Sequence, residues 1–311
     1  MELRNLGKTG IKVSIVGLGC NNFGWKADLE GSRSIIDAAL ANGINFLDTS
    51  DSYGPSEDFI GEVLGARRKD IVLATKFGSP LDEEGKKKGA SRAYIAQAVE
   101  SSLKRLKTDW IDLYQLHFPD PETPIEETLR ALDDLVRQGK VRAIGCSNLT
   151  GAMLREAMTV AADNGLTPFA TTQNEYNLLF RGMEAELGDL IVEHGLGVLP
   201  YFPLANGVLT GKYKPGQPAP AGARLADAPA FFDPYKDPAK WELAARLEMF
   251  AVERGHSLIE LAFSWLAAQP GVASIIAGAS RPEQAAQNAG AAGWKLSATE
   301  LAEIDRMTAA A

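Results

Sequence analysis

The chain has 311 residues, of which 45% are hydrophobic, and it carries a formal charge of −8. This length suits one large α/β barrel and does not by itself require two domains. The acidic balance argues against nucleic acid or an anionic membrane surface as the main partner, although a local basic pocket for a small anion remains open.

The sequence carries no sign of export or membrane insertion. Residues 1–10 lack the basic-then-apolar layout of a signal peptide, and no apolar run is long enough to cross a bilayer. Two cysteines, Cys20 and Cys146, are too few for a disulfide framework and favour a reducing compartment. The three histidines show no metal-ligand spacing. We therefore expect a cytoplasmic protein without a structural metal.

Short apolar runs recur along the chain and alternate with segments of helical periodicity. The runs span 14–19, 45–48, 71–76, 111–117, 141–147, 169–174, 197–201 and 273–278. Continuous apolar runs are typical of parallel strands buried on both faces. Among the helical segments, 91–106 follows Ser91 as a cap, and 124–140 is opened by Pro124 and closed by Gly139.

Eight β-then-α units predict a closed (β/α)₈ TIM barrel. The alternative is an open doubly wound sheet. It is disfavoured because the glycine-containing stretch 17–24 has the wrong spacing for a dinucleotide-binding turn and no helix directly behind it.

Three segments lie outside the eightfold pattern. Residues 3–14 predict a hairpin that plugs the N-terminal end of the barrel. Residues 214–238, rich in Pro, Gly and Ala, indicate a long loop of the kind that forms lids or stays disordered. Residues 297–308 predict an extra helix with a capping box from Ser297 to Glu300. No linker interrupts the chain, so we expect one domain over 1–311.

Polar side chains close six of the predicted strands, and in a (β/α)₈ barrel those strand ends share one rim. They are Asp48, Lys76, His117, Ser147 with Asn148, Gln173 with Asn174, and Tyr201. Tyr53 follows Asp48 by five residues, within reach of the same place. Between them, Ser50, Asp51 and Ser52 are expected to shape the turn.

A carboxylate, an ammonium, an imidazole and a phenol around one rim make a coherent proton-transfer site. A tyrosine hydroxyl has a pKa of about 10, and a nearby ammonium favours the phenolate and lowers that pKa. A carboxylate keeps the ammonium charged, and a histidine can orient a carbonyl oxygen. This predicts a tuned general acid. It has no nucleophile or metal, so redox chemistry would need a hydride from a cofactor.

Each of these residues also has a purely structural interpretation. Asp48 suits a loop cap, and Lys76 suits a solvated rim position or an anion site. His117 suits a hydrogen-bonded core position, and Tyr53 suits amphipathic packing. The functional interpretation depends on all four meeting at one place.

With these four residues in place, the sequence resembles the aldo-keto reductase superfamily over essentially its whole length. It is most similar to the bacterial and potassium-channel-β-like branches. The stretches that carry the resemblance are GINFLDTSDSYG, ATKFG, TDWIDLYQLHFPD, GKVRAIGCSN, QNEYN, PLANGVLTGKY and GASRPEQAAQN.

The resemblance implies a barrel that binds NADP(H) across the strand ends and reduces a carbonyl. Tyr53 would be the proton donor, Lys76 and Asp48 its tuning pair, and His117 the residue that orients the carbonyl. The implied cofactor contacts fall in three groups. The nicotinamide would meet Ser147, Asn148, Gln173 and Tyr201; the pyrophosphate would lie under Phe202, Pro203, Leu204, Asn206, Gly207 and Lys212; and the adenosine end would meet Gly278, Ser280, Arg281, Gln284, Gln287 and Asn288.

The preference for NADPH over NADH rests on the segment 278–288. Ser280 is expected to cap a helix that has Pro282 in its first turn, and helix N-termini attract anions. Arg281 would meet a 2′-phosphate. Several positions depart from the family pattern and remove positive charge or a hydroxyl: Phe202, Asn206, Gly278, Gln284 and Gln287.

An open, permissive substrate pocket is expected from Trp25, Tyr53 and Phe118. Phe231 and Phe232 would either join this pocket or pack on the barrel wall. Aromatic, uncharged walls suit an apolar or aromatic aldehyde or ketone. Two rivals stay open: an NADPH-binding regulatory subunit with slow turnover, and a Schiff-base lyase that uses Lys76. The second is disfavoured because a neighbouring carboxylate would keep that lysine protonated.

Overall fold

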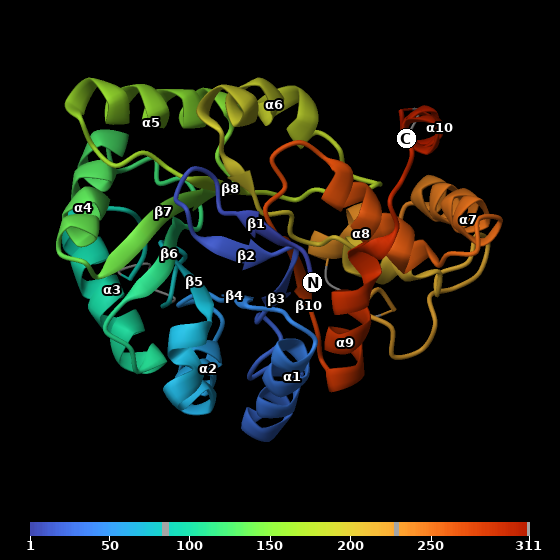
Figure 1. Ribbon diagram of the computed structural model, residues 1–311, viewed down its shortest axis with the longest axis horizontal. Coiled ribbons are helices and arrows are strands. Elements are labelled where there is room, and N and C mark those ends of the chain that lie inside the picture. The colour runs from blue at the N-terminus through green and yellow to red at the C-terminus, as the bar shows by residue number, and fades with distance from the viewer. Residues whose placement is uncertain (83–86, 227–229, 310–311) are drawn as a thin grey trace.

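The computed structural model describes residues 1–82, 87–226 and 230–309. At its centre lies a sheet of eight parallel strands in the spatial order β10-β3-β4-β5-β6-β7-β8-β9 (Figure 1). Their bounds are β3 Val16–Gly19, β4 Phe46–Asp48, β5 Val72–Phe77, β6 Ile111–Leu116, β7 Val141–Ser147, β8 Thr171–Gln173, β9 Gly197–Val198 and β10 Ile275–Gly278. Each strand overlaps one of the eight predicted apolar runs.

The two ends of this sheet meet and close it. Single parallel bridges join Val198 to Val272 and Tyr201 to Ile276. The backbone N–H of Ile276 also donates to the carbonyl of Pro200 at 2.9 Å. Because no sheet edge is left between β9 and β10, the fold is the predicted (β/α)₈ barrel and not the open doubly wound sheet.

Helices wrap the outside of the barrel. Those that follow the strands from β3 to β8 are α1 Leu29–Ala41, α2 Ser56–Leu64 with the 3₁₀ turn η1 Gly65–Asp70, α3 Arg92–Leu106, α4 Ile125–Arg137, α5 Gly151–Asn164 and α6 Met183–His194. The predicted start of α3 and the predicted ends of α4 are confirmed. The Ser91 hydroxyl caps α3, Pro124 directly precedes α4, and Gly139 follows α4 with a φ of +74°.

The N-terminal hairpin fills the bottom of the barrel, as predicted. Strands β1 (Leu3–Asn5) and β2 (Lys12–Ser14) pair antiparallel. Leu6, Ile11 and Val13 pack in one buried cluster with side chains from the first residues of the strands, including Phe46 and Val72. This end of the barrel is therefore solid, and any ligand has to enter from the opposite rim.

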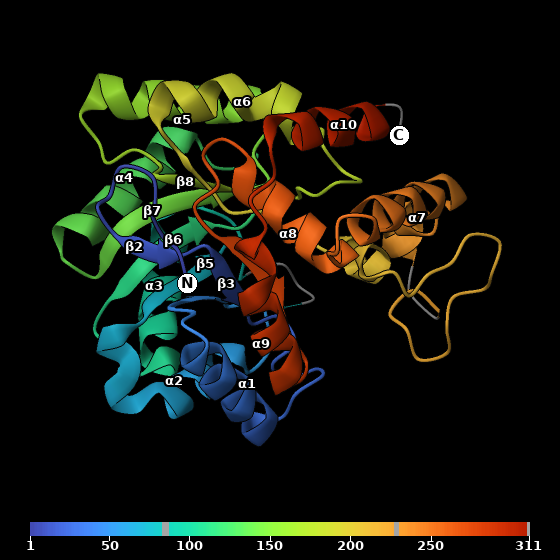
Figure 2. The same ribbon diagram turned by 45° about the vertical axis from the view of Figure 1, so that its right-hand side comes forward.

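The chain between β9 and β10 is longer than the other crossovers. It contains the 3₁₀ turns η2 (Ala205–Thr210) and η3 (Ala230–Tyr235) and the helices α7 (Pro238–Val252) and α8 (Leu258–Ala268). The segment ahead of α7 stands out from the barrel (Figure 2). It corresponds to the predicted loop 214–238, of which residues 227–229 lie outside the described part.

The chain ends with α9 (Pro282–Gly290), η4 (Ala291–Gly293) and α10 (Ala298–Thr308). The predicted capping box is present, because the Ser297 hydroxyl accepts from the backbone N–H of Glu300 and the Glu300 carboxylate accepts from that of Ser297. Arg181 ties α10 to the barrel through a 2.8 Å ion pair with Asp305. Across the described ranges, no helix is long and apolar enough to span a bilayer, and no cluster of acidic, histidine or cysteine side chains is arranged to hold a metal.

Candidate active site

A cleft of about 710 Å³ opens at the C-terminal ends of the strands. Most of the predicted site residues line it: Asp48, Tyr53, His117, Phe118, Ser147, Asn148, Gln173, Tyr201, Phe202, Pro203, Leu204, Asn206, Gly207, Lys212, Gly278, Ser280, Arg281 and Gln284. Lys76 lies buried directly behind Asp48. Gln287, Asn288 and Trp25 are not part of the lining.

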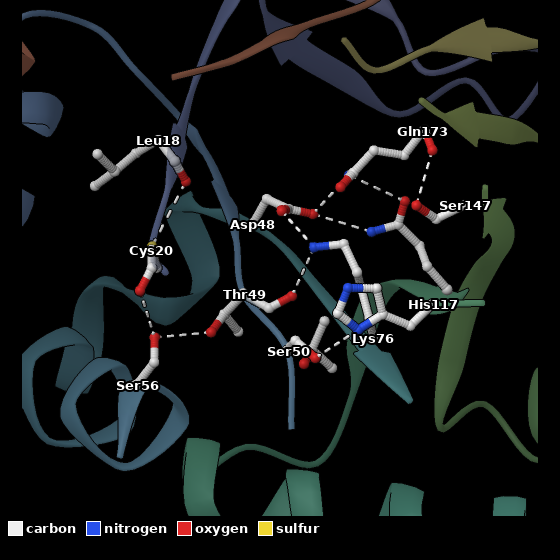
Figure 3. Close-up of polar contacts among 12 residues, drawn as sticks. Leu18, Cys20, Asp48, Thr49, Ser50, Ser56, Lys76, His117, Ser147 and Gln173 are labelled. Atoms are coloured by element: carbon white, nitrogen blue, oxygen red, sulfur yellow. Dashed lines mark hydrogen bonds and ion pairs between the residues drawn. The ribbon is translucent and has the colours of Figure 1, made fainter. Parts of the chain in front are cut away.

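The innermost feature of the cleft is an ion pair between Lys76 and Asp48. The Lys76 Nζ lies 2.5 Å from the Asp48 Oδ2 and donates a second hydrogen bond to the carbonyl of Thr49 at 3.0 Å (Figure 3). Both side chains are almost fully buried, at 1% and 2% exposed. Burial disfavours the ammonium, but the Asp48 carboxylate and Tyr53 outweigh it and raise the pKa of Lys76. The lysine therefore stays charged.

Two glutamines hold Asp48 in place. The Nε2 atoms of Gln115 on β6 and Gln173 on β8 each donate to the Asp48 Oδ1 at 3.0 Å. Figure 3 shows the contact from Gln173. One carboxylate thus accepts from three side chains on three other strands. The sequence interpretation missed Gln115. The sequence does hint at this role. Gln115 lies two residues after Leu113 on β6, so both side chains point into the barrel, where apolar residues are usual.

Tyr53 lies next to this ion pair. The Lys76 Nζ is 5.2 Å from the centre of the Tyr53 ring, and the ring meets that of His117 edge-on at 5.7 Å. Burial raises the pKa of Tyr53 above its ordinary value of 10, and the Lys76 ammonium offsets this only in part. The expected net lowering is therefore wrong for the free protein, because desolvation exceeds the attraction to Lys76. The phenol is protonated at neutral pH.

His117 is held neutral. Burial lowers the pKa of His117 to about 3, and the Lys76 ammonium adds to the effect. The Nδ1 meets the hydroxyls of Ser50 at 3.1 Å and Ser79 at 2.9 Å, while one face of the ring stacks on Phe118 at 4.7 Å. A neutral imidazole is a hydrogen-bond donor at one nitrogen and an acceptor at the other, and it makes a poor acid.

The rim above β7 and β8 is a connected set of neutral polar groups. The Ser147 hydroxyl donates to the Gln173 carbonyl at 2.8 Å, and the Asn148 Nδ2 donates to the His117 carbonyl at 3.0 Å. The Tyr201 hydroxyl donates to the Asn148 Oδ1 at 2.9 Å. Asn148 adopts a φ of +60°, a conformation that asparagine tolerates better than most residues.

The remaining lining of the cleft is basic. It includes Lys26, Lys212, Arg224 and Arg281, and its one acidic side chain among the described residues is Asp48. None of these four cations pairs with a carboxylate within the described part of the chain. Burial lowers the pKa of Lys212, and the nearby Arg224 lowers it further. Two like charges held together in this way would gain from an anion between them.

The N-cap of the helix that follows β10 differs from the prediction. Pro282 is the first residue of α9, as expected, but the N-cap is Arg281 and not Ser280. The Ser280 hydroxyl and backbone N–H both point to the Gln284 Oε1, at 3.0 and 2.8 Å. The Gln284 side chain folds back over the first turn of α9 and accepts both of these hydrogen bonds. The Ser280 hydroxyl is therefore bonded to a side chain and does not cap the backbone of the helix.

Comparison with known proteins relates almost the whole chain to one family. The aldo/keto reductase family profile matches residues 15–309. The chain is 36% identical over 304 residues to a probable voltage-gated potassium channel subunit beta of Arabidopsis thaliana, covering 93% of this chain and 90% of that protein. It is 38% identical to the uncharacterized oxidoreductase YqkF and 35% identical to the aldo-keto reductase YhdN, both of Bacillus subtilis, with at least 94% of this chain and 91% of each relative covered.

This chain belongs to the aldo/keto reductase family. It is accordingly an oxidoreductase, and nicotinamide cofactors are the ones that its family generally binds.

Arg224 is the main residue of this aldo/keto reductase cleft that the sequence interpretation missed. It lies in the predicted loop 214–238, and it donates to the Asn206 Oδ1 at 2.9 Å and the Asn22 Oδ1 at 3.4 Å. Asn206 is one of the positions where this chain lacks the positive charge of the family pattern. The Arg224 guanidinium brings a positive charge to that position from another loop. Its only sequence signal was a single arginine in a stretch of Pro, Gly and Ala.

The aromatic residues expected at the substrate pocket divide between the cleft, the core and the surface. Phe231 lines the cleft and is 70% exposed, whereas Phe232 packs against the hydrophobic core. Phe118 also lines the cleft, at 48% exposed. Trp25 is 63% exposed outside it, with the Arg224 guanidinium 5.7 Å from its ring centre.

Proposed function

We propose that this chain is an NADPH-dependent reductase that converts an aldehyde or ketone into the alcohol, with Tyr53 as the proton donor. The observation that carries this proposal is the buried Lys76–Asp48 pair beside the Tyr53 ring, in a cleft that also holds four cations with no carboxylate partner among the described residues. Such a cleft combines a protonated phenol with a site for phosphate groups.

The residues of the cleft fit a phosphate-bearing nicotinamide cofactor. Lys212 and Arg224 would hold its pyrophosphate, and Arg281, near the N-terminus of α9, would hold a 2′-phosphate, which is the reason to favour NADPH over NADH. Ser147, Asn148 and Gln173 would hold the carboxamide, and Tyr201 would stack on the ring. When bound, this cofactor supplies the hydride that no side chain of the protein can provide.

The side chains around Tyr53 handle the proton. The Tyr53 hydroxyl gives its proton to the developing alkoxide, and the Lys76 ammonium stabilises the phenolate that remains. Asp48 keeps that ammonium charged and in position, while Gln115 and Gln173 keep Asp48 fixed. Neutral His117 donates one hydrogen bond to the carbonyl oxygen and orients it.

The substrate is an apolar or aromatic carbonyl compound. Phe118 and Phe231 are exposed aromatic rings on the cleft, and Phe118 stacks on His117. Three of the four cations of the cleft, Lys212, Arg224 and Arg281, are engaged by the cofactor in this proposal. The fourth, Lys26, has its Nζ over the exposed ring of Trp25, 4.6 Å from the ring centre. A flat, uncharged aldehyde fits these walls best.

The test follows NADPH oxidation with a reactive aromatic aldehyde in the wild type and in Tyr53→Phe. We expect the variant to lose at least about 100-fold in kcat, as is usual when a general acid is removed, and to bind NADPH as before. Tyr94→Phe is the matched control, because the Tyr94 hydroxyl is buried and has no hydrogen-bond partner among the described residues. Loss of turnover in both variants, or in neither, would contradict the proposal.

A second candidate is a cofactor-binding regulatory subunit, and the relatives named as probable potassium channel subunits beta favour it. It would bind NADPH tightly, yet the wild type would oxidise it no faster than Tyr53→Phe. The Schiff-base lyase is weaker still, because a nucleophilic lysine must be neutral, whereas the pKa of Lys76 is raised by Asp48 and Tyr53 against the effect of burial.

A further inference from the structure

The His117 ring can act on a carbonyl oxygen in only one of its two neutral tautomers. A hydrogen on Nε2 lets that nitrogen donate to the substrate, whereas a hydrogen on Nδ1 leaves Nε2 as an acceptor that repels a carbonyl oxygen. Figure 3 shows Nδ1 turned towards Ser50 and Nε2 turned away from it. The partners of Nδ1 therefore decide which tautomer is present.

Ser50 is poorly placed to donate to Nδ1. Its hydroxyl carries one hydrogen, and the Asp51 Oδ1 lies 3.3 Å away as a competing acceptor, with the Ser52 hydroxyl at 2.9 Å. The Ser50 Oγ also accepts a hydrogen bond from the backbone N–H of Ser52 at 3.2 Å. A carboxylate is a stronger acceptor than an imidazole nitrogen, so the Ser50 hydrogen belongs to Asp51 whenever Asp51 is ionised.

Ser79 has no such competition. Within the described ranges, the one hydrogen-bond partner of its hydroxyl is the His117 Nδ1, at 2.9 Å. The side chain is buried, with 7% of it exposed. It reaches the histidine because Gly78, directly after β5, adopts a φ of +103°, a conformation that a residue with a side chain rarely takes.

We propose that Ser79 is a positioning residue that sets the tautomer of His117: its hydroxyl donates to Nδ1 and so keeps the hydrogen of the ring on Nε2, facing the substrate. This inference rests on the proposed carbonyl reduction. Without Ser79, the arrangement that satisfies every group is the opposite one. Nδ1–H would donate to Ser50, whose own hydrogen would stay on Asp51.

The tautomer is measured directly by long-range ¹H–¹⁵N spectra of protein labelled with ¹⁵N-histidine, at pH 8. The chain has three histidines, so His117→Gln identifies the signal of interest. We expect the Nε2–H form in the wild type and the Nδ1–H form in Ser79→Ala. Ser52→Ala is the matched control, because the Ser52 hydroxyl contacts Ser50 and not the ring, and it should keep the wild-type tautomer.

Kinetics with the aromatic aldehyde give the second readout. Ser79→Ala should lose at least about 10-fold in kcat with unchanged NADPH affinity, since removing one donor to a developing oxyanion costs roughly 10²–10³-fold. Ser79→Thr, which keeps the hydroxyl, should recover most of the rate. An Nδ1–H tautomer in the wild type, or an unchanged tautomer in folded Ser79→Ala, overturns the inference. If no carbonyl is reduced at all, the proposed function fails while the spectra still decide the tautomer.

Discussion

Lys76 and Asp48 form a 2.5 Å ion pair, and both residues are at most 2% exposed to solvent. Taking two charges out of water costs several kcal/mol for each ion, and their attraction only offsets that cost. The pair is therefore better explained by the chemistry it supports than by stability. This relationship separates the effects of two variants.

Lys76→Met removes one charge and leaves Asp48 buried without a counter-ion. We expect the free energy of unfolding to fall by about 3–5 kcal/mol, as is typical for a broken buried pair, and carbonyl reduction to be lost. The double variant Asp48→Asn/Lys76→Met should recover most of the stability and none of the activity. Urea denaturation and NADPH oxidation measure the two quantities. A double variant that regains activity would show that the ion pair is structural only.

Arg224→Ala should weaken NADPH binding by roughly 10-fold or more, because one charge-assisted hydrogen bond contributes about 1.5–3 kcal/mol. The kcat at saturating cofactor should change little, since Arg224 contacts Asn206 and Asn22 and not the residues assigned to proton transfer. Arg155→Ala is the control, as that arginine is 61% exposed and 3.8 Å from its nearest carboxylate. Titration of cofactor fluorescence at two salt concentrations measures the effect. Equal affinities in the two variants would remove Arg224 from the anion site.

Arg281→Ala separates the two cofactors. If this side chain meets a 2′-phosphate, the variant should bind NADPH at least about 10-fold more weakly while its affinity for NADH stays the same. The ratio of the two dissociation constants is the quantity to measure. A parallel loss for NADPH and NADH would assign Arg281 to the pyrophosphate or to the fold, and the preference for NADPH would need another explanation.

Asp51→Asn should change how stability depends on pH. Burial raises the pKa of Asp51 from 3.8 to about 7; Glu57 adds to this, while Arg105, Ser50 and Lys76 oppose it. Tyr94 and Tyr114 also face it, since the Asp51 charge raises the pKa of both. The folded wild type thus holds a proton that the unfolded chain releases, so its stability falls as pH rises from about 4 to 7.

The amide of the Asp51→Asn variant does not titrate, and the Asp51 Oδ2 that its nitrogen can replace has no hydrogen-bond partner among the described residues. Relative to the wild type, the variant should gain up to about 4 kcal/mol between pH 4 and pH 7, at about 1.4 kcal/mol for each pKa unit. Thermal or urea unfolding across this range tests the sign. A constant difference between the two proteins across this range would show that folding leaves the pKa of Asp51 unchanged.

Leu6→Ala tests the hairpin plug at the other end of the barrel. Leu6 is fully buried among inward-facing side chains, so its truncation should cost about 2–5 kcal/mol of unfolding free energy. Leu3→Ala, in the same hairpin but 54% exposed, should cost far less. Both variants should keep the wild-type kcat at low temperature. A large loss of activity in Leu6→Ala alone would link the plug to the cleft.

The sequence by itself determined the barrel and the order of its parts. Strand runs such as 71–76, the capping box at Ser297 and the plug hairpin depend on local spacing, which the chain displays directly. It also placed Asp48, Lys76 and His117 on one rim, because parallel strands of a barrel end on the same side. The cations of the cleft were visible in part, as Lys212 and Arg281.

Tertiary structure alone decided the contacts that cross strands and loops. Gln115 on Asp48, Arg224 on Asn206 and Ser79 on the His117 ring join residues between 18 and 67 positions apart, and no local pattern predicts such distances. The sign of the Tyr53 pKa shift belongs here as well. It depends on how completely the phenol is buried against how closely Lys76 approaches it, and both quantities exist only once the barrel has closed.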